Sequence, residues 1–130
     1  AATALMDRLE ARLRFGEILA LQPGLEALDT QPAVGPGIEA MRDAAHQFFG
    51  GLGRPRSYVL ASYWARLAAA AGDAPSAALL TEIDSRATRL AARTATGARD
   101  AEAWAALEAR VSDRALRAWI DQDIAGRLAR

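Results

Sequence analysis

His46 is the only histidine of the chain, and its setting makes it the residue best suited to do chemistry. Along Ile38–Leu52, apolar side chains recur at i, i+3, i+7, i+10 and i+14, which is the spacing of one buried stripe on an α-helix. His46 lies about 100° round the helix from Ala45, a member of that stripe. We therefore expect the imidazole to be open to solvent, with Gly50 one turn further on leaving room for another molecule.

An imidazole in this position can act as a general base, accept a phosphoryl group or bind a metal ion. A metal site is disfavoured, because the chain has no second histidine and no cysteine, and Glu39, Asp43 and His46 would form one cramped face. A Ser-His-Asp triad is disfavoured as well, since no serine stands in a G-x-S-x-G turn. A surface histidine paired with Asp43 is the structural alternative. The sequence therefore implies no metal ion and no other cofactor.

The balance of charged residues argues against several classes of function. Sixteen basic and sixteen acidic side chains give a formal net charge of zero, so nothing draws the chain toward nucleic acid or an anionic membrane. Every basic residue is arginine, which removes the P-loop lysine and Schiff-base chemistry. The high content of alanine, arginine and glycine is typical of a GC-rich bacterial genome.

The sequence also gives expectations about the compartment. No apolar run approaches the roughly 18–20 residues that a membrane span needs. The start of the chain, AATALMDRLE, lacks the basic-then-apolar plan of a signal peptide. We expect a cytoplasmic protein, with an export signal that has already been removed as the alternative.

Breaks in the apolar pattern divide the chain into helical segments. Proline and glycine interrupt it at 23–24, 30–37, 50–55, 72 and 97, and the apolar face changes at Phe15–Gly16, which predicts a kink or a new packing partner. No run alternates as a strand would. We predict one all-α domain over residues 1–130, with five to seven helices around a four-helix-bundle core. Whether the section from Asp100 onward forms one helix or two stays open.

The segment Arg42–Gly51, with the sequence RDAAHQFFGG, resembles the phosphoacceptor segment of histidine phosphotransfer (HPt) domains. In that family a helix presents a histidine after small residues. The histidine is followed by a hydrophobic residue, then in most members by a lysine, and then by a glycine and another small residue. The downstream segment Leu60–Ile83 resembles the family's next helix, short Gly-Asp turn and closing helix. The resemblance spans Ile38–Leu90 and implies a regulatory protein of a signalling phosphorelay.

In such a relay, the Nε2 atom of His46 would accept a phosphoryl group from an aspartyl phosphate of a receiver domain, or from a kinase, and pass it on. The partner would supply the metal and the catalytic groups, and a glycine beside the histidine leaves space for them. Phe49 stands where the family has its lysine, so Arg42, Arg54 or Arg56 would supply the positive charge instead. The Phe49 ring either contacts a partner or is buried under the following loop. The candidate site is therefore His46 as phosphoacceptor, with the binding residues Arg42, Asp43, Phe49, Gly50, Arg54 and Arg56.

This chain departs from the HPt pattern in two further respects. The sequence GGLGRP, from Gly50 to Pro55, breaks a helix that HPt domains usually continue. The residues after Gly97 are additional to the family's pattern.

A non-catalytic interaction module or accessory subunit is the alternative function. Trp64, Trp104 and Trp119 are large aromatic residues in a small domain, and core packing is their default role. Two or more of them exposed on one patch would instead indicate a protein partner. The alanine-rich last helix would also suit close packing against a second copy in a homodimer.

A third hypothesis is an enzyme, because the chain opens with an arginine-rich segment, Arg8–Leu21, that is similar to exported all-helical chorismate mutases. Those enzymes stabilise a dianionic transition state with arginines, a lysine and a glutamate or glutamine. Arg12 and Gln22 lie near the right spacing, whereas the lysine is absent and Pro23 stands near its place. The later Arg-Glu pair is not visible near Gly37–Glu39. The similarity implies a closed pocket lined by several arginines.

Overall fold

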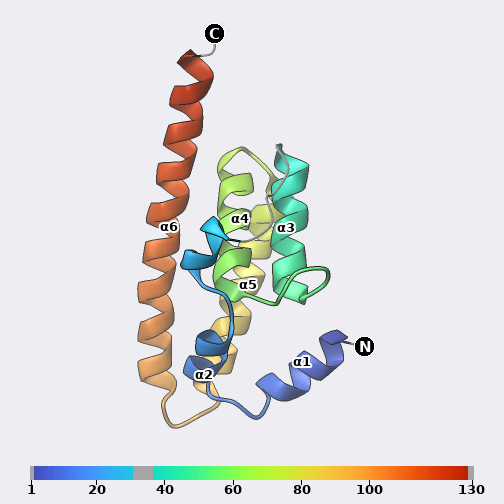
Figure 1. Ribbon diagram of the computed structural model, residues 1–130. Coiled ribbons are helices and arrows are strands. Elements are labelled where there is room, and N and C mark those ends of the chain that lie inside the picture. The colour runs from blue at the N-terminus through green and yellow to red at the C-terminus, as the bar shows by residue number, and fades with distance from the viewer. Residues whose placement is uncertain (1, 31–36, 129–130) are drawn as a thin grey trace.

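Six α-helices and one short 3-10 helix make up the described part of the chain (Figure 1). The computed structural model describes residues 2–30 and 37–128. In chain order the elements are α1 (Ala2–Glu10), α2 (Phe15–Leu21), η1 (Leu25–Asp29), α3 (Ile38–Gly50), α4 (Tyr58–Ala70), α5 (Ala74–Ala92) and α6 (Gly97–Leu128). The described residues contain no strand, so the predicted all-α class with five to seven helices is confirmed.

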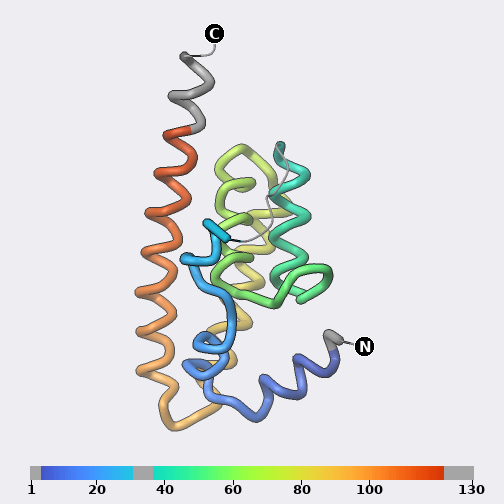
Figure 2. Tube along the Cα trace, in the orientation of Figure 1, coloured from blue at the N-terminus to red at the C-terminus, as the bar shows by residue number. Residues whose placement is uncertain are grey.

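Helices α3 to α6 form the body of the fold. Successive helices run in opposite directions, and α4 is in contact with α3, α5 and α6 (Figure 1). Short connections favour this arrangement, because they bring each helix back beside the one before it. Figure 2 shows α1 and α2 at the lower end of this group, where α2 packs against α5 and α6.

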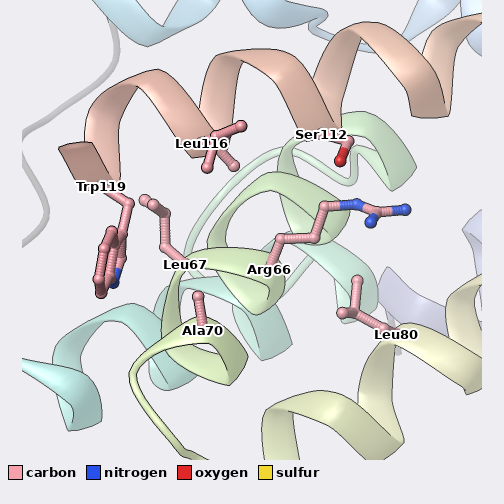
Figure 3. Close-up of a pocket in the computed structure, with 8 residues that line it drawn as sticks. Arg66, Leu67, Ala70, Leu80, Ser112, Leu116 and Trp119 are labelled. Atoms are coloured by element: carbon pink, nitrogen blue, oxygen red, sulfur yellow. The ribbon is translucent and has the colours of Figure 1, made fainter.

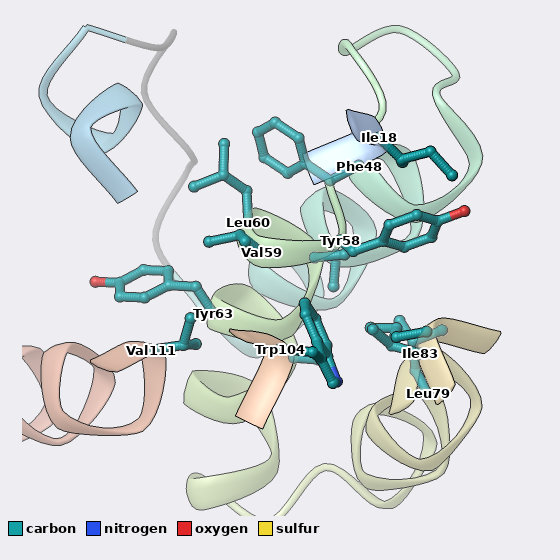
Figure 4. Packing of buried hydrophobic residues seen from close by; sticks show 14 of the residues in the cluster. Ile18, Phe48, Tyr58, Val59, Leu60, Tyr63, Leu79, Ile83, Trp104 and Val111 are labelled. Atoms are coloured by element: carbon teal, nitrogen blue, oxygen red, sulfur yellow. The ribbon is translucent and has the colours of Figure 1, made fainter. Parts of the chain in front are cut away.

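The core is built around α4, because most of the side chains of that helix are buried. Figure 4 shows Tyr58, Leu60 and Tyr63 of α4 among apolar residues of the neighbouring helices. The Phe15 ring of α2 lies 6.1 Å from the Tyr58 ring and 5.7 Å from the Trp104 ring of α6, measured between ring centroids. Tilted and edge-on arrangements of this kind stabilise aromatic pairs beyond the area that they bury.

Caps define the helix ends at the predicted breaks. Gly51, the residue after α3, has a φ of 70°, which a glycine adopts without the steric penalty of a Cβ. Ser57 caps α4, where its Oγ accepts a hydrogen bond from the Leu60 N–H at 3.0 Å. Asp73 caps α5 in the same way, through the Ser76 N–H at 3.1 Å.

The two ends of the chain show what periodicity left open. The change of apolar face near Phe15 marks a full break, since α1 ends at Glu10 and α2 begins at Phe15. The last section is one helix, α6, whose 32 residues span about 48 Å at 1.5 Å per residue. It therefore extends past the end of the other helices (Figure 1).

The predicted loop and the predicted lack of a membrane span concern the parts of the chain between and along the helices. Most of the predicted loop at 30–37 lies outside the described residues, since positions 31–36 are not among them. Within the described ranges, no helix has both the length and the apolar character needed to cross a bilayer.

Candidate functional site

His46 is exposed on α3, as its position beside the apolar stripe predicted. Phe48, two residues on, points into the core instead. A Cβ added to Gly50 would lie 3.6 Å from the Leu52 side chain, which is ordinary van der Waals contact. The imidazole can therefore be reached from solvent, while Leu52 covers part of the space that the glycine leaves.

The arginines expected to hold a phosphate each have another partner. Arg42 Nη1 lies 2.8 Å from Asp73 Oδ1, and this ion pair joins α3 to the start of α5. Arg54 Nε donates a hydrogen bond to Gln47 Oε1 at 3.0 Å. Arg56 is buried, with 6% of its surface exposed. Arg42 and Arg54 thus lie close to the surface of α3, whereas Arg56 belongs to the interior.

Asp43 and Phe49 lie in different surroundings. Asp43 is exposed on the same helix as His46. Phe49 is half-buried, and its ring lies edge-on to the Tyr58 ring with 6.0 Å between centroids. Phe49 therefore packs at the edge of the core, which agrees with burial rather than with a role in docking a partner.

Asp7, Glu10, Arg56, Tyr58 and Arg86 form a group of charged and polar side chains packed against α1, which the sequence patterns did not indicate. We call it the buried ion network after its buried members Glu10, Arg56 and Tyr58; the side chains of Asp7 and Arg86 are 46% and 30% exposed. Glu10 Oε2 accepts hydrogen bonds from the Tyr58 hydroxyl at 2.7 Å and from Arg86 Nη2 at 3.0 Å. Arg56 Nη1 lies 2.8 Å from Asp7 Oδ1 and 3.2 Å from Glu10 Oε1. Arg86 Nη2 also lies 2.9 Å from Asp7 Oδ1. Two acidic and two basic side chains therefore balance each other's charge.

The network fixes the protonation of two of its members at neutral pH. Burial raises the pKa of the Tyr58 hydroxyl well above its ordinary value, and the hydrogen bond to Glu10 raises it further. The hydrogen bond from Arg56 holds the pKa of Asp7 below its ordinary value of 3.8. A neutral tyrosine and an ionised aspartate suit a structural link between α1, α4 and α5 better than an acid–base pair.

One local signal could have indicated this network. Glu10 shares a helical face with Met6 and Leu13, at i+4 and i+7 from Met6, which is an unusual place for a charge. Its partners could not be predicted, because one of them, Arg86, lies 76 residues away in the chain.

An apolar groove of about 600 Å³ lies beside the network, between α1, α2 and the α3–α4 loop, and we call it the α1 groove. Leu9 and Leu21 are exposed at this groove, whereas Ile18 is buried in its wall. The residues that line it are Met6, Leu9, Glu10, Leu13, Ile18, Leu21, Gln22, Pro23, Gly51, Pro55 and Arg56.

A second apolar groove, of about 430 Å³, lies where α6 crosses α4 and α5 (Figure 3). Leu116 and Trp119 line it and are nevertheless 58% and 41% exposed, and Ile120, one turn after Leu116, is 44% exposed. We call these three residues and the groove the α6 surface. The groove is lined by Arg66, Leu67, Ala70, Leu80, Ser112, Ala115, Leu116 and Trp119.

The three tryptophans do not gather on one patch. Trp104 is buried in the core at 4% exposure, and Trp64 is half-buried with its ring edge-on to that of Tyr63. Of the three, Trp119 is exposed. The apolar character of the α6 surface therefore comes mainly from aliphatic residues.

Acidic side chains of α5 and α6 meet at a junction with α4. Glu108 Oε2 accepts a hydrogen bond from Arg66 Nη2 at 3.0 Å, and Asp84 accepts one from the Trp104 indole N–H at 3.1 Å. Burial, together with the hydrogen bond and the negative charge of Asp84, raises the pKa of Glu108 to about 7. Glu108 therefore changes its charge near neutrality.

Three arginines of α6, Arg110, Arg114 and Arg117, line a small open cavity of about 230 Å³. The residues that resemble the chorismate mutase pattern lie elsewhere, since Arg12 is exposed after α1 and Gln22 lines the α1 groove. Among the described residues, no group of three or more histidine and carboxylate side chains could hold a metal ion.

Comparison with known proteins does not assign the chain to a family. No protein-family model, no curated protein and no solved structure matches it. The basis for its function is therefore the set of its own residues and their geometry.

Proposed function

We propose that the protein is a non-catalytic helical interaction module that forms a homodimer through the α6 surface. The observation that supports this best is the exposure of Leu116, Trp119 and Ile120 beside an apolar groove. Trp119 of α6 and Ala70, the last residue of α4, both line that groove (Figure 3). Exposed aliphatic residues at a groove favour association with another protein surface, since association removes them from water.

The charges around the α6 surface suit a second copy of the same chain. Asp113, Arg114, Arg117 and Asp121 place both signs of charge next to the apolar residues. In an antiparallel pair of α6 helices, arginines of one copy lie near aspartates of the other while the apolar residues meet in the centre. The net charge of zero adds no general repulsion between the copies.

Sedimentation equilibrium of the purified protein tests this proposal. We expect a dimer whose dissociation constant rises at least about tenfold in Leu116→Arg and in Ile120→Arg, because each variant places a charge in an apolar interface. Leu5→Arg is the matched control, since Leu5 is 53% exposed on α1, and it should dimerise as the wild type does. A wild-type protein that stays monomeric, or α6 variants that dimerise normally, would contradict the proposal.

We propose phosphotransfer through His46 as the second candidate function, and the exposure of its imidazole on α3 supports it. The HPt resemblance identifies the same residue as the phosphoacceptor, with a receiver domain as the partner. Arg42 would have to leave Asp73, 2.8 Å away, in order to contact a phosphoryl group. For this reason phosphotransfer ranks below the interaction module.

Incubation with a receiver domain that carries an aspartyl phosphate tests the relay. We expect an acid-labile label on the wild type and none on His46→Gln. Gly50→Ala should keep the fold, because its added methyl group meets Leu52 at an ordinary distance of 3.6 Å, but should slow transfer by narrowing the space beside the ring. An unlabelled wild type, or equal labelling of His46→Gln, would rule the relay out.

A further inference from the structure

The α1 groove has the shape and the lining of a ligand site, and the dimer proposed above does not use it. Its volume is about 600 Å³, within the range of about 300–1,000 Å³ that is usual for small-molecule pockets. Leu9, Leu13, Ile18 and Leu21 give it apolar walls. Since α1 supplies some of these residues and α2 others, an occupant would lie between the two helices.

Three polar residues of the groove carry buried side-chain atoms that make no hydrogen bond. Four buried side-chain atoms in the described part of the chain lack a hydrogen bond, namely Glu10 Oε1, Gln22 Nε2, Arg56 Nε and Arg66 Nε. The first three belong to residues that line the α1 groove. Glu10 and Arg56 are 2% and 6% exposed, so bulk water does not readily satisfy them. Glu10 Oε1 lies 3.2 Å from Arg56 Nη1 in an ion pair but has a further lone pair, so all three atoms could hydrogen-bond to a polar group of a ligand.

The hydrogen bonds that these residues already make decide which of their atoms can bind a ligand. Gln22 Oε1 accepts a hydrogen bond from the Tyr58 N–H at 3.1 Å, so its Nε2 remains as a donor. Arg56 Nη1 donates to Asp7 Oδ1 at 2.8 Å, and its Nε remains as a second donor. Glu10 Oε2 accepts two hydrogen bonds, whereas Oε1 accepts none and lies 3.2 Å from Arg56 Nη1 in an ion pair, so a lone pair of Oε1 remains as an acceptor. The groove thus offers two donors and one acceptor.

The charges of the buried ion network disfavour an ionised ligand. Asp7 and Glu10 are balanced by Arg56 and Arg86 at distances of 2.8 to 3.2 Å. An ionised head group would add an unbalanced charge beside the buried side chains of Glu10 and Arg56, which is costly. A hydroxyl or primary amide instead brings an oxygen that accepts from the two donors and a hydrogen that it donates to the carboxylate.

We propose that the α1 groove binds an elongated apolar molecule with an uncharged hydroxyl or primary amide head group. The head group lies at Gln22 and Arg56, and the apolar part lies between α1 and α2. Because the three atoms that make no hydrogen bond are covered in the structure, α1 moves outward as the head group enters. Such a movement exposes little core, since Glu10 is the one buried residue among the described side chains of α1.

Calorimetric titrations with 1-decanol, decanoate and decylammonium test the choice of head group. We expect the alcohol to bind at least about tenfold more tightly than either ion. In the NMR spectrum, the signals of the Gln22 side-chain amide should shift on addition of the alcohol. Absence of alcohol binding, or equal binding of the three compounds, would overturn the proposal.

Two groove variants locate the site, one at an exposed leucine and one a conservative change of a glutamine. Leu9→Arg, which places a charge in the groove, should weaken binding of 1-decanol at least about tenfold, and Leu116→Arg on the α6 surface should not. Gln22→Glu keeps the acceptor for Tyr58 but loses the donor, and should weaken binding about fivefold or more. Gln47→Glu, exposed on α3, is its control. Unchanged binding by both groove variants would overturn the assignment.

Discussion

Glu108 has no distinctive setting in the sequence, but it is a side chain that titrates near neutrality in the folded protein. It lies where α4, α5 and α6 meet, and its carboxylate accepts a hydrogen bond from Arg66 at 3.0 Å. Burial and the neighbouring carboxyl group of Asp84 raise its pKa to about 7, and Arg66 only partly opposes them. His46, which stands out in the sequence as the only histidine, is an exposed side chain on α3. At the scale of the residue, surroundings rather than type decide the chemistry.

We expect the stability contribution of Glu108 to decline as the pH rises from 4.5 to about 7. The carboxyl group keeps its proton up to about pH 7 in the folded protein, whereas its unfolded reference value is 4.5. The folded state therefore binds more protons in this window, so the contribution is complete below pH 4.5 and lost above about 7. Glu108→Gln should remove the decline. Urea unfolding of both proteins at a series of pH values measures it.

Glu102→Gln is the matched control for this experiment, because Glu102 is exposed on the same helix. It should reproduce the wild-type pH profile. Hydrogen bonds from Glu108 and Trp104 lower the pKa of Asp84 below 3.8, so the titration of Asp84 lies outside the window. If the stability of the wild type and that of Glu108→Gln depended on pH in the same way, the pKa of Glu108 would not be raised in the folded protein.

At the scale of the element, two glycines in the loop after α3 have different roles, because Arg56 packs against one of them and not against the other. Gly51 and Gly53 have φ values of 70° and 78°, which L side chains rarely adopt. A Cβ on Gly51 would lie 3.2 Å from the Cβ of Arg56, whereas one on Gly53 would meet nothing within 4 Å. The first glycine is therefore needed for both conformation and space, and the second for conformation alone.

Gly51→Ala should destabilise the protein more than Gly53→Ala does. Each variant costs about 1–2 kcal/mol for the left-handed conformation. Gly51→Ala also displaces Arg56, whose guanidinium is held 2.8 Å from Asp7, so its cost is higher. Chemical denaturation of both variants measures the difference, in which effects on the unfolded chain cancel. Equal losses of stability in the two variants would contradict this, because Arg56 would then move away from the added methyl group without destabilising the protein.

At the scale of the whole molecule, α1 is attached differently from the other helices. Its apolar residues Leu5 and Leu9 are 53% and 47% exposed, and it is held mainly by ion pairs of Asp7 and Glu10 with Arg56 and Arg86. Helix α4, by contrast, is buried along most of its length. Local opening is easiest where few apolar contacts must be broken.

Hydrogen exchange should therefore be at least about tenfold faster in α1 than in α4. Arg86→Leu, which removes contacts with Asp7 and Glu10 at 2.9 and 3.0 Å, should speed exchange in α1 further while α3 stays protected. Arg89→Leu, exposed on the same helix, is the control. Mass spectrometry of peptides from each helix measures the rates. Equal protection of α1 and α4 would refute this view of the attachment.

Local patterns in the sequence determined the elements of this protein. Helical spacing of apolar residues, with glycine and proline at the breaks, predicted the all-α class, the end of α3 near Gly50 and the exposure of His46. These features depend on residues within a few turns of each other, because helix formation and capping are local. The same patterns could not tell whether the last section was one helix, since neither Ser112 nor Asp113 interrupts the helical spacing.

Tertiary structure alone decided which side chains meet. Glu10 and Arg86 are 76 residues apart in the chain, yet they share the buried ion network, and Arg56 belongs there rather than beside His46. Both apolar grooves likewise join residues from three segments each. Distant contacts arise from how helices pack and where each one stops, which periodicity within one helix does not encode. For this reason the sequence predicted the elements, and packing created the grooves and the charge balance from which function is proposed.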